Sequence, residues 1–490
     1  MGNTSSKRSR SELALLIRGT VIHSPSLDTF LILENAVLGI GTDGRVAFLE
    51  DNHEEELPAG GSLILRDGGA VTLPKYHYQI VVLPPRGFIC PGLVDTHTHA
   101  PQSKNAGIGY DLQLLEWLTK YTFPTEAAFD SLSFAAKVCR NAVSRTLRNG
   151  TTSCLYFATI HTDAAVQLGR IASGMGQRAF IGKVNMDRNA PDFYVEASAK
   201  ASLAETERFI DAMLKDESDG GKGQSVGDGG ICVECEPLGP PAQPVICPRF
   251  VPTCTPELMK GLGKLSNRNG GLLITSHVSE NKGEIAWVRE LHPELPTYTS
   301  CYDDPGLLTP RTILAHGVYL DKEERALLRS RKSTVSHCPV SNCMLRSGML
   351  NVRRMLEEGN SVALGTDVSG GAPASMLTAV REALKVSNMV SLTDKRPEGE
   401  EGGMYAPLTA HEAFHLATAA GARSLCVEGL TGDFTVGSVF DAVVINPEAD
   451  GSPFDIYDGE GSDIAFEKWL ILGDDRNTDS VYVNGKKVLG

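Results

Sequence analysis

The segment Pro91-Gly-Leu-Val-Asp-Thr-His-Thr-His99 decides how the rest of the sequence is interpreted. It overlaps a short apolar run and ends in two histidines that are two residues apart. Side chains two apart on a strand point to the same face, so His97 and His99 can bind one metal ion together. In a parallel barrel, catalytic groups project from the carboxyl ends of the strands. Further runs that end in titratable residues would therefore indicate a barrel enzyme.

Apolar runs rich in Val, Ile and Thr recur along the chain, and helical patterns separate most of them. This alternation is typical of a parallel sheet with crossover helices. The eight runs are Phe88–Thr96, Thr151–Phe157, Arg178–Asp187, Val245–Thr253, Leu272–Glu280, Thr312–Leu320, Ser333–Asn342 and Ser361–Ser369. The helical stretches include Glu126–Asn149, Asp163–Gln177, Ala199–Lys215, Glu257–Arg268 and Val352–Glu358. Eight such units predict an α/β fold, a (β/α)8 TIM-like barrel.

Short strand patterns precede and follow the barrel. The runs are Leu15–Ile22, Phe30–Leu33 and Val46–Leu49 at the start, and Ala442–Ile445, Leu470–Leu472, Val481–Val483 and Lys487–Leu489 at the end. Because chain ends often lie close together, we expect these strands to form one small β-sandwich domain. The predicted division is a disordered tail (1–11), a small β domain (12–87 with 430–490) and the barrel (88–429). Residues 51–87 and Asp216–Gly230 are predicted to be irregular surface segments.

The composition limits the class of protein. The chain has 490 residues, 41% of them hydrophobic, and a formal net charge of −14. These values predict a packed, soluble protein, and the negative charge argues against nucleic acid as a ligand. No apolar run approaches the ~18 residues of a membrane span. The eleven cysteines form no compact framework and the first residues lack a secretory signal, which predicts a cytoplasmic protein.

The first ten residues, Met1-Gly-Asn-Thr-Ser-Ser-Lys-Arg-Ser-Arg10, allow two interpretations. Gly2, Ser6 and the basic residues fit an N-myristoylation pattern with a basic second anchor. The alternative is a disordered polar tail. Membrane contact is expected only if Gly2 is acylated.

Four of the predicted strands end in imidazole or carboxylate groups. The residues are His97 and His99, then His277 with Glu280, then His316, and last Asp367. Imidazoles with a carboxylate suit zinc or iron(II) and leave a position for water. The metal lowers the pKa of that water toward ~7. Carboxylates then have to move protons, and Glu280 and Asp367 are available.

The same residues carry a resemblance to a known family. Pro91–His99 resembles the first-strand signature of the amidohydrolase superfamily, and residues 88–489 resemble its guanine deaminase branch. The matching segments, in order, are His97-Thr-His-Ala-Pro-Gln102, Pro248-Arg-Phe250, Ser276-His-Val-Ser-Glu280, Ala315-His-Gly317, His337-Cys-Pro-Val-Ser-Asn342, Gly365-Thr-Asp367 and Leu472-Gly-Asp-Asp-Arg-Asn477.

The resemblance implies a hydrolase that acts on a C–N bond of a cyclic amidine, converting guanine and water to xanthine and ammonia in purine breakdown and salvage. It implies a homodimer with zinc. The implied zinc ligands are His97, His99, His277 and Asp367. The implied catalytic residues are Glu280 as proton carrier, His316 at the tetrahedral centre and Asp367 beside the attacking water. The implied substrate-binding residues are Gln102, Arg249, Phe250, Glu280 and His316.

Residue chemistry agrees with this implication. The O6 carbonyl of guanine suits a fixed Arg donor, and its flat ring suits an aromatic wall. Two-metal members of the superfamily have a carboxylated Lys at the end of the fourth strand. Here that strand reads Val245-Ile-Cys-Pro-Arg-Phe250, without Lys, so one zinc per chain is expected. The alternatives are a related amidohydrolase for another aminopurine, a pteridine or a triazine, and a non-catalytic scaffold.

Other motifs have structural interpretations that we prefer. His411-Glu-Ala-Phe-His415 matches a zinc-protease motif but lacks its third ligand, so a structural helix is favoured. Cys232-Val-Glu-Cys235 matches C-x-x-C, and a surface loop is favoured over a structural zinc site. The roles of His161 and His337 stay open, with His337 either packed or lining the pocket.

Overall fold

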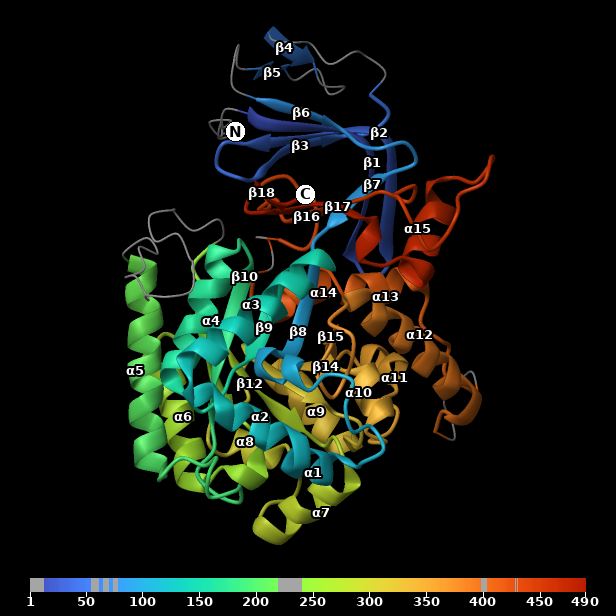
Figure 1. The fold of residues 1–490 in the computed structure, drawn as a ribbon. Helices are drawn as coiled ribbons and strands as arrows, with labels where there is room; N and C mark the ends of the chain where they lie inside the picture. The colour runs from blue at the N-terminus through green and yellow to red at the C-terminus, as the bar shows by residue number, and fades with distance from the viewer. Residues whose placement is uncertain are drawn as a thin grey trace, which may run out of the picture.

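A computed structural model gives the fold of the chain (Figure 1). It describes residues 13–53, 61–64, 70–73, 78–218, 240–397, 403–427, 429 and 431–490. The predicted tail with Gly2, most of Asp216–Gly230, and the pair Cys232 and Cys235 lie outside these residues. A large barrel domain occupies one end of the molecule and a small β domain occupies the other.

Eight of the described strands form one parallel sheet that closes into the predicted barrel. In sheet order they are β8 (Leu93–His99), β9 (Thr151–Phe157), β10 (Arg178–Asn185), β11 (Gln243–Pro248), β12 (Ile274–Val278), β13 (Thr312–His316), β14 (Thr334–His337) and β15 (Ser361–Leu364). The last strand, β15, also contacts β8. Each strand overlaps one predicted run, which confirms the (β/α)8 architecture, although β8 extends past its run to His99 and β11 begins before its run at Gln243.

Helices cover the outside of the barrel (Figure 1). The longer ones are α3 (Leu132–Arg148), α4 (Thr162–Gly174), α5 (Ala199–Ser218), α6 (Pro256–Arg268), α7 (Lys282–Leu291), α9 (Lys322–Arg331) and α12 (Met376–Thr393). Helix α3 shows why they form: its buried residues recur at helical spacing, from Ala135 and Val138 to Ala142 and Val143. Helix α6 begins at Pro256, where Thr255 accepts a hydrogen bond from the Leu258 N–H as an N-cap.

Shorter elements complete the barrel domain. They are α1 (Leu114–Trp117), α2 (Phe123–Ala127), α8 (Ser300–Asp303), α10 (Pro339–Met344), α11 (Val352–Glu357), α13 (Ala410–Leu416), α14 (Ala419–Ser424), and the 3-10 or π turns η1 (Ala100–Lys104), η2 (Leu118–Thr122), η3 (Ala128–Asp130) and η4 (Val251–Thr253). Elements η1 to η3 with α1 and α2 form the long connection that follows β8.

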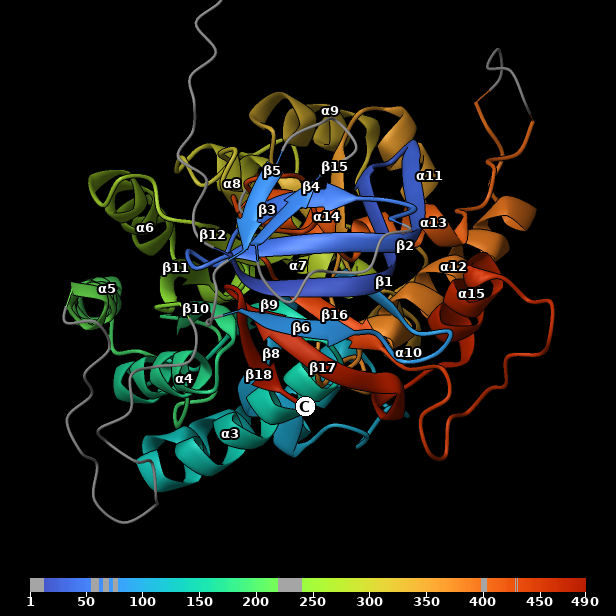
Figure 2. The ribbon, with the colours of Figure 1, turned by 90° about the horizontal axis from the view of Figure 1, so that it is seen from above.

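The chain ends form the small β domain, as predicted. Its strands hydrogen-bond into one mixed sheet, in the order β18 (Lys486–Leu489), β17 (Thr478–Val483), β16 (Ala442–Ile445), β7 (Phe88–Pro91), β1 (Leu13–Ser26), β2 (Thr29–Gly41) and β3 (Val46–Glu50), with β6 (Gln79–Val82) paired to β1. One buried cluster joins residues of both ends, such as Ile17, Leu38, Val444 and Tyr482. Figure 2 shows this sheet lying across the barrel.

Three sequence predictions need correction. Residues 51–87 are not wholly irregular, because they contain β4 (Gly61–Ile64), β5 (Ala70–Leu73) and β6. The run Phe88–Thr96 belongs to two sheets, since β7 lies in the small domain and β8 in the barrel. A glycine separates them, because a Cβ at Gly92 would lie 2.0 Å from Thr152 Oγ1. The predicted chain division at residue 88 therefore falls inside the small sheet.

Leu470–Leu472 is the third case, because it forms the end of α15 (Ser462–Leu472) rather than a strand. A short apolar run does not distinguish a strand from a buried helix turn. The end of the helix is held from α12, where Arg381 Nε donates a hydrogen bond to Leu470 O at 2.8 Å. After it, η5 (Asp475–Asn477) leads into β17.

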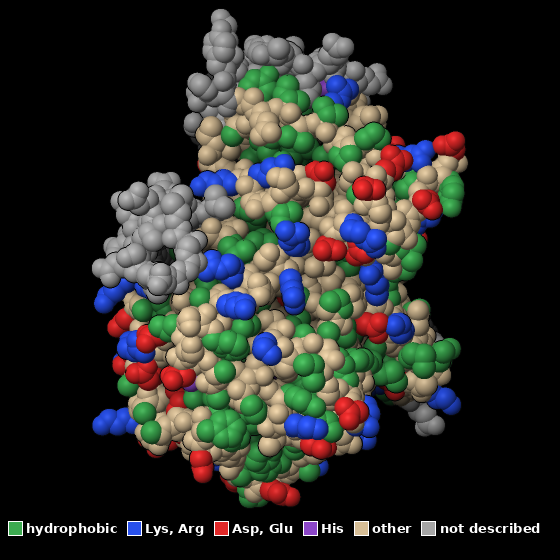
Figure 3. Space-filling model, viewed as in Figure 1, with side chains coloured by type: hydrophobic (Ala, Val, Ile, Leu, Met, Phe, Trp, Pro, Cys, Tyr) green, Lys and Arg blue, Asp and Glu red, His purple; other side chains and the backbone are tan. Residues whose placement is uncertain are grey.

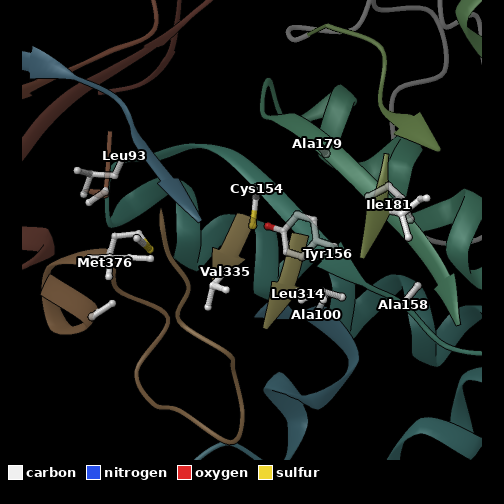
Figure 4. Packing of buried hydrophobic residues seen from close by; sticks show 14 of the residues in the cluster. Leu93, Ala100, Cys154, Tyr156, Ala158, Ala179, Ile181, Leu314, Val335 and Met376 are labelled. Atoms are coloured by element: carbon white, nitrogen blue, oxygen red, sulfur yellow. The ribbon is translucent and has the colours of Figure 1, made fainter. Parts of the chain in front are cut away.

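The barrel core is closely packed around β9 (Figure 4). Cys154 and Tyr156 lie on this strand, and both are fully buried. The Tyr156 hydroxyl donates to Gln177 Oε1 at 2.8 Å and lies 3.0 Å from Thr146 Oγ1. This polar group is therefore satisfied inside an apolar core, which fixes α3 and the end of α4 against the strand.

The outer surface is mixed in charge. On the face in Figure 3, Lys and Arg side chains occupy the middle, and most Asp and Glu side chains lie toward the edges. Helix α3 contributes the exposed Lys137, Arg145 and Arg148. Among the described residues, no helix combines the length and apolar character needed to cross a bilayer.

A buried ion pair connects the two domains and yields a prediction. Arg178 Nε of β10 lies 3.0 Å from Asp441 Oδ2, and the Asp441 side chain is fully buried. Asp441 also accepts a hydrogen bond from the Asn484 N–H at 2.7 Å. Asp441→Ala leaves a largely buried guanidinium unpaired, so we expect the free energy of unfolding in urea to fall by about 3 kcal/mol.

The control for this prediction is Asp163→Ala, which removes the partner of Arg208 in an exposed pair. Exposed pairs contribute little, so this variant should unfold at the same urea concentration as the wild type. Equal stability of both variants would show that the Arg178–Asp441 pair does not hold the domains together.

Candidate active site

Strand ends bring the predicted metal ligands into one buried cluster. His97 and His99 come from β8, His277 comes from β12, and Asp367 follows β15. The Nε2 atom of His99 lies 3.3 Å from Nε2 of His97 and 3.3 Å from Nε2 of His277. Asp367 Oδ1 lies 3.2 Å from His97 Nε2 and 3.3 Å from His99 Nε2. The sequence prediction thus named four side chains that do meet.

These spacings fit a tetrahedral metal ion. Zinc binds imidazole nitrogen and carboxylate oxygen at about 2.0–2.1 Å, so two ligand atoms on neighbouring corners are about 3.3–3.4 Å apart. The four contacts within the cluster have that length. A donating and an accepting imidazole nitrogen could share one hydrogen bond, but three imidazole nitrogens and a carboxylate oxygen that converge on one point have the arrangement of a metal site. The donor set therefore fits zinc.

The protonation states also favour metal binding. Burial lowers the pKa of His97 to about 4 and holds the pKa of His277 well below its ordinary value. His277 Nδ1 lies 2.7 Å from the carbonyl oxygen of Arg249, which fixes the proton on Nδ1 and leaves Nε2 free to bind a metal. Burial would raise the pKa of Asp367, but hydrogen bonds from His97 and His99 outweigh it and keep this carboxylate ionised.

Glu280 and His316 stand together beside this cluster. Glu280 Oε2 lies 3.4 Å from His316 Nε2, and His316 Nε2 lies 3.8 Å from Asp367 Oδ2. His316 Nδ1 lies 2.9 Å from Asn342 Oδ1, which directs Nε2 toward the cluster. His316 itself is close enough to join His97, His277 and Asp367 as a ligand set with atoms within 4.8 Å. Its shorter contact with Glu280 favours the catalytic role that the resemblance implies.

The pKa values of Glu280 and His316 are both raised, but by different causes. Burial raises the pKa of Glu280 to about 7, although the neighbouring His316 opposes the shift. Burial would lower the pKa of His316, but Glu280 and Asp367 raise it above its ordinary value. A carboxyl group that titrates near neutral pH can both accept and donate a proton, which is what a proton carrier requires.

Backbone strain is concentrated at the same strand ends. Ser279, His316 and Asp367 all adopt positive φ angles, of 47°, 75° and 49°. Such conformations are uncommon for residues other than glycine and cluster at functional sites. Here they turn the chain sharply after the strands, which places the side chains of His316 and Asp367 over the end of the barrel.

A small, partly open cavity lies over the cluster. Its polar lining includes Gln102, Arg249, Glu280 and His316, as predicted, and Phe250 adds an aromatic wall. The sequence did not single out its apolar side, which comes mainly from the long connection after β8. These residues are Leu114, Trp117, Leu118 and Leu345.

Glu126 is a site residue that sequence reasoning missed. It lies on α2, fully buried behind the cavity wall, and binds Arg249 through both carboxylate oxygens. It also accepts a hydrogen bond from Gln102 Nε2 at 2.9 Å. The sequence pattern marked Glu126 only as the first residue of the predicted helix Glu126–Asn149. One signal was available, because a buried Arg249 requires an acidic partner.

Four other histidines discussed in the sequence analysis do not join the cluster. His411 stacks on Phe30 with ring centroids 3.8 Å apart, and His415 Nδ1 lies 2.9 Å from Ser24 O, so the His411–His415 motif forms a structural helix packed on β1. His161 is partly buried, and its Nδ1 lies 3.0 Å from Thr159 Oγ1. His337 is fully buried and does not line the cavity. Burial lowers its pKa to about 3.

Comparisons with known proteins agree with this geometry. The model of the Amidohydrolase family matches residues 88–488. Guanine deaminase of Dictyostelium discoideum is 42% identical over 480 residues, which cover 98% of this chain and 99% of that protein. Guanine deaminase of Homo sapiens is 40% identical, with 97% of each chain covered.

Comparison with solved structures shows the same similarity in the fold. A guanine deaminase from C. acetobutylicum, solved with guanine bound in the active site, has a TM-score of 0.80 and 34% sequence identity. The match covers 97% of this chain and all of that one. Fold, ligand cluster and similarity thus point to the same group of proteins, and the chain belongs to the amidohydrolase family.

Proposed function

We propose that this protein is a guanine deaminase, which hydrolyses guanine to xanthine and ammonia. The observation that carries the proposal is one cavity with two chemically different sides. A cluster suited to zinc lies on one side, and the buried donors and acceptors of Arg249 and Gln102 lie on the other. Relatives that match this chain over nearly its whole length, named guanine deaminases, support it.

The residues have distinct tasks in this reaction. Arg249 and Gln102 bind the polar edge of the purine, and Phe250 packs against its ring, so that C2 faces the His and Asp cluster. His97, His99, His277 and Asp367 would hold the zinc, which would lower the pKa of a bound water. Glu280 moves one proton of the attacking water to a ring nitrogen, and then moves the proton of the new C2 hydroxyl to the amine, which leaves as ammonia while the C2 carbonyl forms. His316, held by Asn342, donates toward the charge that develops at the tetrahedral centre.

One zinc per chain is part of the proposal. Strand β11 ends without a Lys that could bridge two ions. Lys183 of β10 is buried but is bound to Glu196, so it is engaged elsewhere. We further propose that the enzyme acts in the cytoplasm, on the basis of its scattered cysteines, and as a homodimer, on the basis of the resemblance alone.

The test uses the purified full chain with guanine, and with 2-aminopurine, cytosine and adenosine as competing substrates. We expect the loss of guanine absorbance to coincide with the formation of xanthine and ammonia. The other bases should react at least about 10²-fold more slowly, because a base without the 6-oxo group leaves Arg249 without its acceptor. A lack of xanthine formation in zinc-loaded protein would refute the proposal.

The raised pKa of Glu280 gives a pH prediction. Its folded pKa of about 7 lies above the ordinary value for Glu, so the carboxylate needed to accept a proton is lost as the pH falls below about 7. We therefore expect kcat/KM for guanine to fall about tenfold for each pH unit below about 6.5 and to level off above about 7.5. A profile that stays level down to pH 5 would show that no group of this pKa acts in the reaction.

A further inference from the structure

Glu126 binds both polar residues of the substrate side without lining the cavity itself. Its Oε2 accepts a hydrogen bond from Arg249 Nη1 at 2.6 Å, and its Oε1 accepts from Arg249 Nη2 at 3.2 Å. The same Oε1 accepts from Gln102 Nε2 at 2.9 Å. The Arg249 side chain is 3% exposed and the Glu126 side chain is fully buried. The guanidinium also lies over the Phe123 ring, 5.0 Å from its centroid.

The first consequence concerns charge. Arg249 carries a permanent positive charge into a buried site, and a lone charge there would attract anions. The bidentate carboxylate of Glu126 neutralises this charge from behind. Arg249 lines the cavity and keeps N–H groups that Glu126 does not use. The wall of the cavity therefore presents hydrogen-bond donors with almost no net charge, which suits a neutral oxopurine better than an anionic one.

The second consequence concerns the orientation of the Gln102 amide. A carboxylate can only accept hydrogen bonds, so the NH2 end of the amide must face Glu126. On the other end, the backbone N–H of Ser369 can only donate, and it lies 3.4 Å from Gln102 Oε1. Both neighbours therefore require the same orientation. Gln102 thus has a fixed polarity, although an isolated amide could bind in either sense.

We propose that Glu126 is a positioning residue that sets the specificity of the cavity for a neutral oxopurine. It neutralises Arg249 and fixes the polarity of Gln102. This inference rests on the proposed function, since it concerns the same cavity. A merely structural role would make Glu126 important for stability without changing which bases bind.

The test compares Glu126→Gln with the wild type. The substitution keeps the shape of the side chain, removes its charge and lets Gln102 turn. We expect KM for guanine to rise by about 10²-fold and kcat to change by less than about 10-fold. The rate preference for guanine over 2-aminopurine should shrink by about 10-fold. Inhibition by urate, an anionic oxopurine, should become about 10-fold tighter, because Arg249 is then an uncompensated cation.

Two further variants keep the test independent of misfolding. Glu126→Asp retains the charge but shortens the reach, so KM for guanine should rise by at least about 10-fold while urate inhibition does not tighten. In an Arg249→Ala background, Glu126→Gln should leave urate inhibition unchanged, because the cation it exposes is gone. Glu412→Gln is the matched control, since Glu412 also binds an arginine, Arg353, through both oxygens but lies outside the cavity.

The outcomes separate this inference from the proposed function. A wild-type enzyme that fails to convert guanine refutes the proposed function. Guanine turnover by the wild type, combined with an unchanged KM in Glu126→Asp, overturns the role of Glu126. It is also overturned if Glu126→Gln weakens guanine and urate equally, because that result reports a distorted cavity rather than a changed charge.

Discussion

Glu280→Gln should lower kcat for guanine by about 10²–10⁴-fold while the protein keeps about one zinc per chain. The amide has the shape of the carboxyl group but cannot take a proton at neutral pH. Zinc should remain because Glu280 lies beyond the four-residue cluster, where its Oε2 contacts His316 Nε2 at 3.4 Å and its Oε1 accepts from Ser347 Oγ at 3.1 Å. Steady-state rates and metal analysis of the same samples measure both expectations.

Glu290→Gln, on the helix α7 that follows Glu280, is the matched control for protein preparation and folding. Glu290 is exposed near the end of α7, so Glu290→Gln changes the same chemical group without touching the cavity. It should retain wild-type kcat and KM. A Glu280→Gln enzyme with kcat within a few-fold of the wild type would remove Glu280 from the reaction, and a loss of zinc in that variant would assign it a structural role instead.

The barrel and its metal cluster could be predicted because both depend on local patterns. Eight strands of parallel type leave continuous apolar runs, and the ligands follow these runs directly. His97 and His99 are two apart on one strand, while His277 and His316 mark the ends of two neighbouring strands. The barrel topology alone then brings them to one edge, so no knowledge of tertiary packing was needed.

The substrate side could be predicted only in part, because it depends on packing between distant segments. Arg249 directly follows strand β11, so its position could be inferred. Trp117 and Glu126 belong to the long connection after β8, whose path over the cavity is determined by contacts that no periodicity records. A buried arginine demands a counter-ion, but the sequence offers sixty acidic residues and does not say which one approaches it.

The wrong predictions for Phe88–Thr96 and Leu470–Leu472 have a similar cause. Hydrophobic patterning shows that a segment is buried but not which sheet buries it. Phe88–Pro91 and Leu93–His99 are one apolar stretch in sequence, yet they pair with different strands. Within Leu470–Leu472, Leu470 packs into the core from a helix, whereas Ile471 and Leu472 are exposed. Both distinctions depend on long-range pairing.

Removal of the metal is expected to abolish guanine turnover, and zinc should restore it. The cluster offers three imidazole nitrogens and one carboxylate with spacings of 3.2–3.3 Å, a set that suits zinc. Magnesium should not restore activity, because it prefers six oxygen ligands and keeps its water. Full-length protein treated with a chelator and then dialysed against zinc or magnesium provides the comparison.

The thermal stability of the protein gives an independent measurement of zinc binding at this site. Without a cation, the buried Asp367 carboxylate depends on hydrogen bonds from His97 and His99, and burial lowers the pKa of His97. Zinc at about 1,000 times its Kd should stabilise the folded chain by about 4 kcal/mol, which raises Tm in proportion. His277→Ala removes one ligand, so both the gain in Tm and the recovery of turnover on adding zinc should be largely lost. If the chelated protein turns over guanine at the wild-type rate, these four residues are not a catalytic metal site.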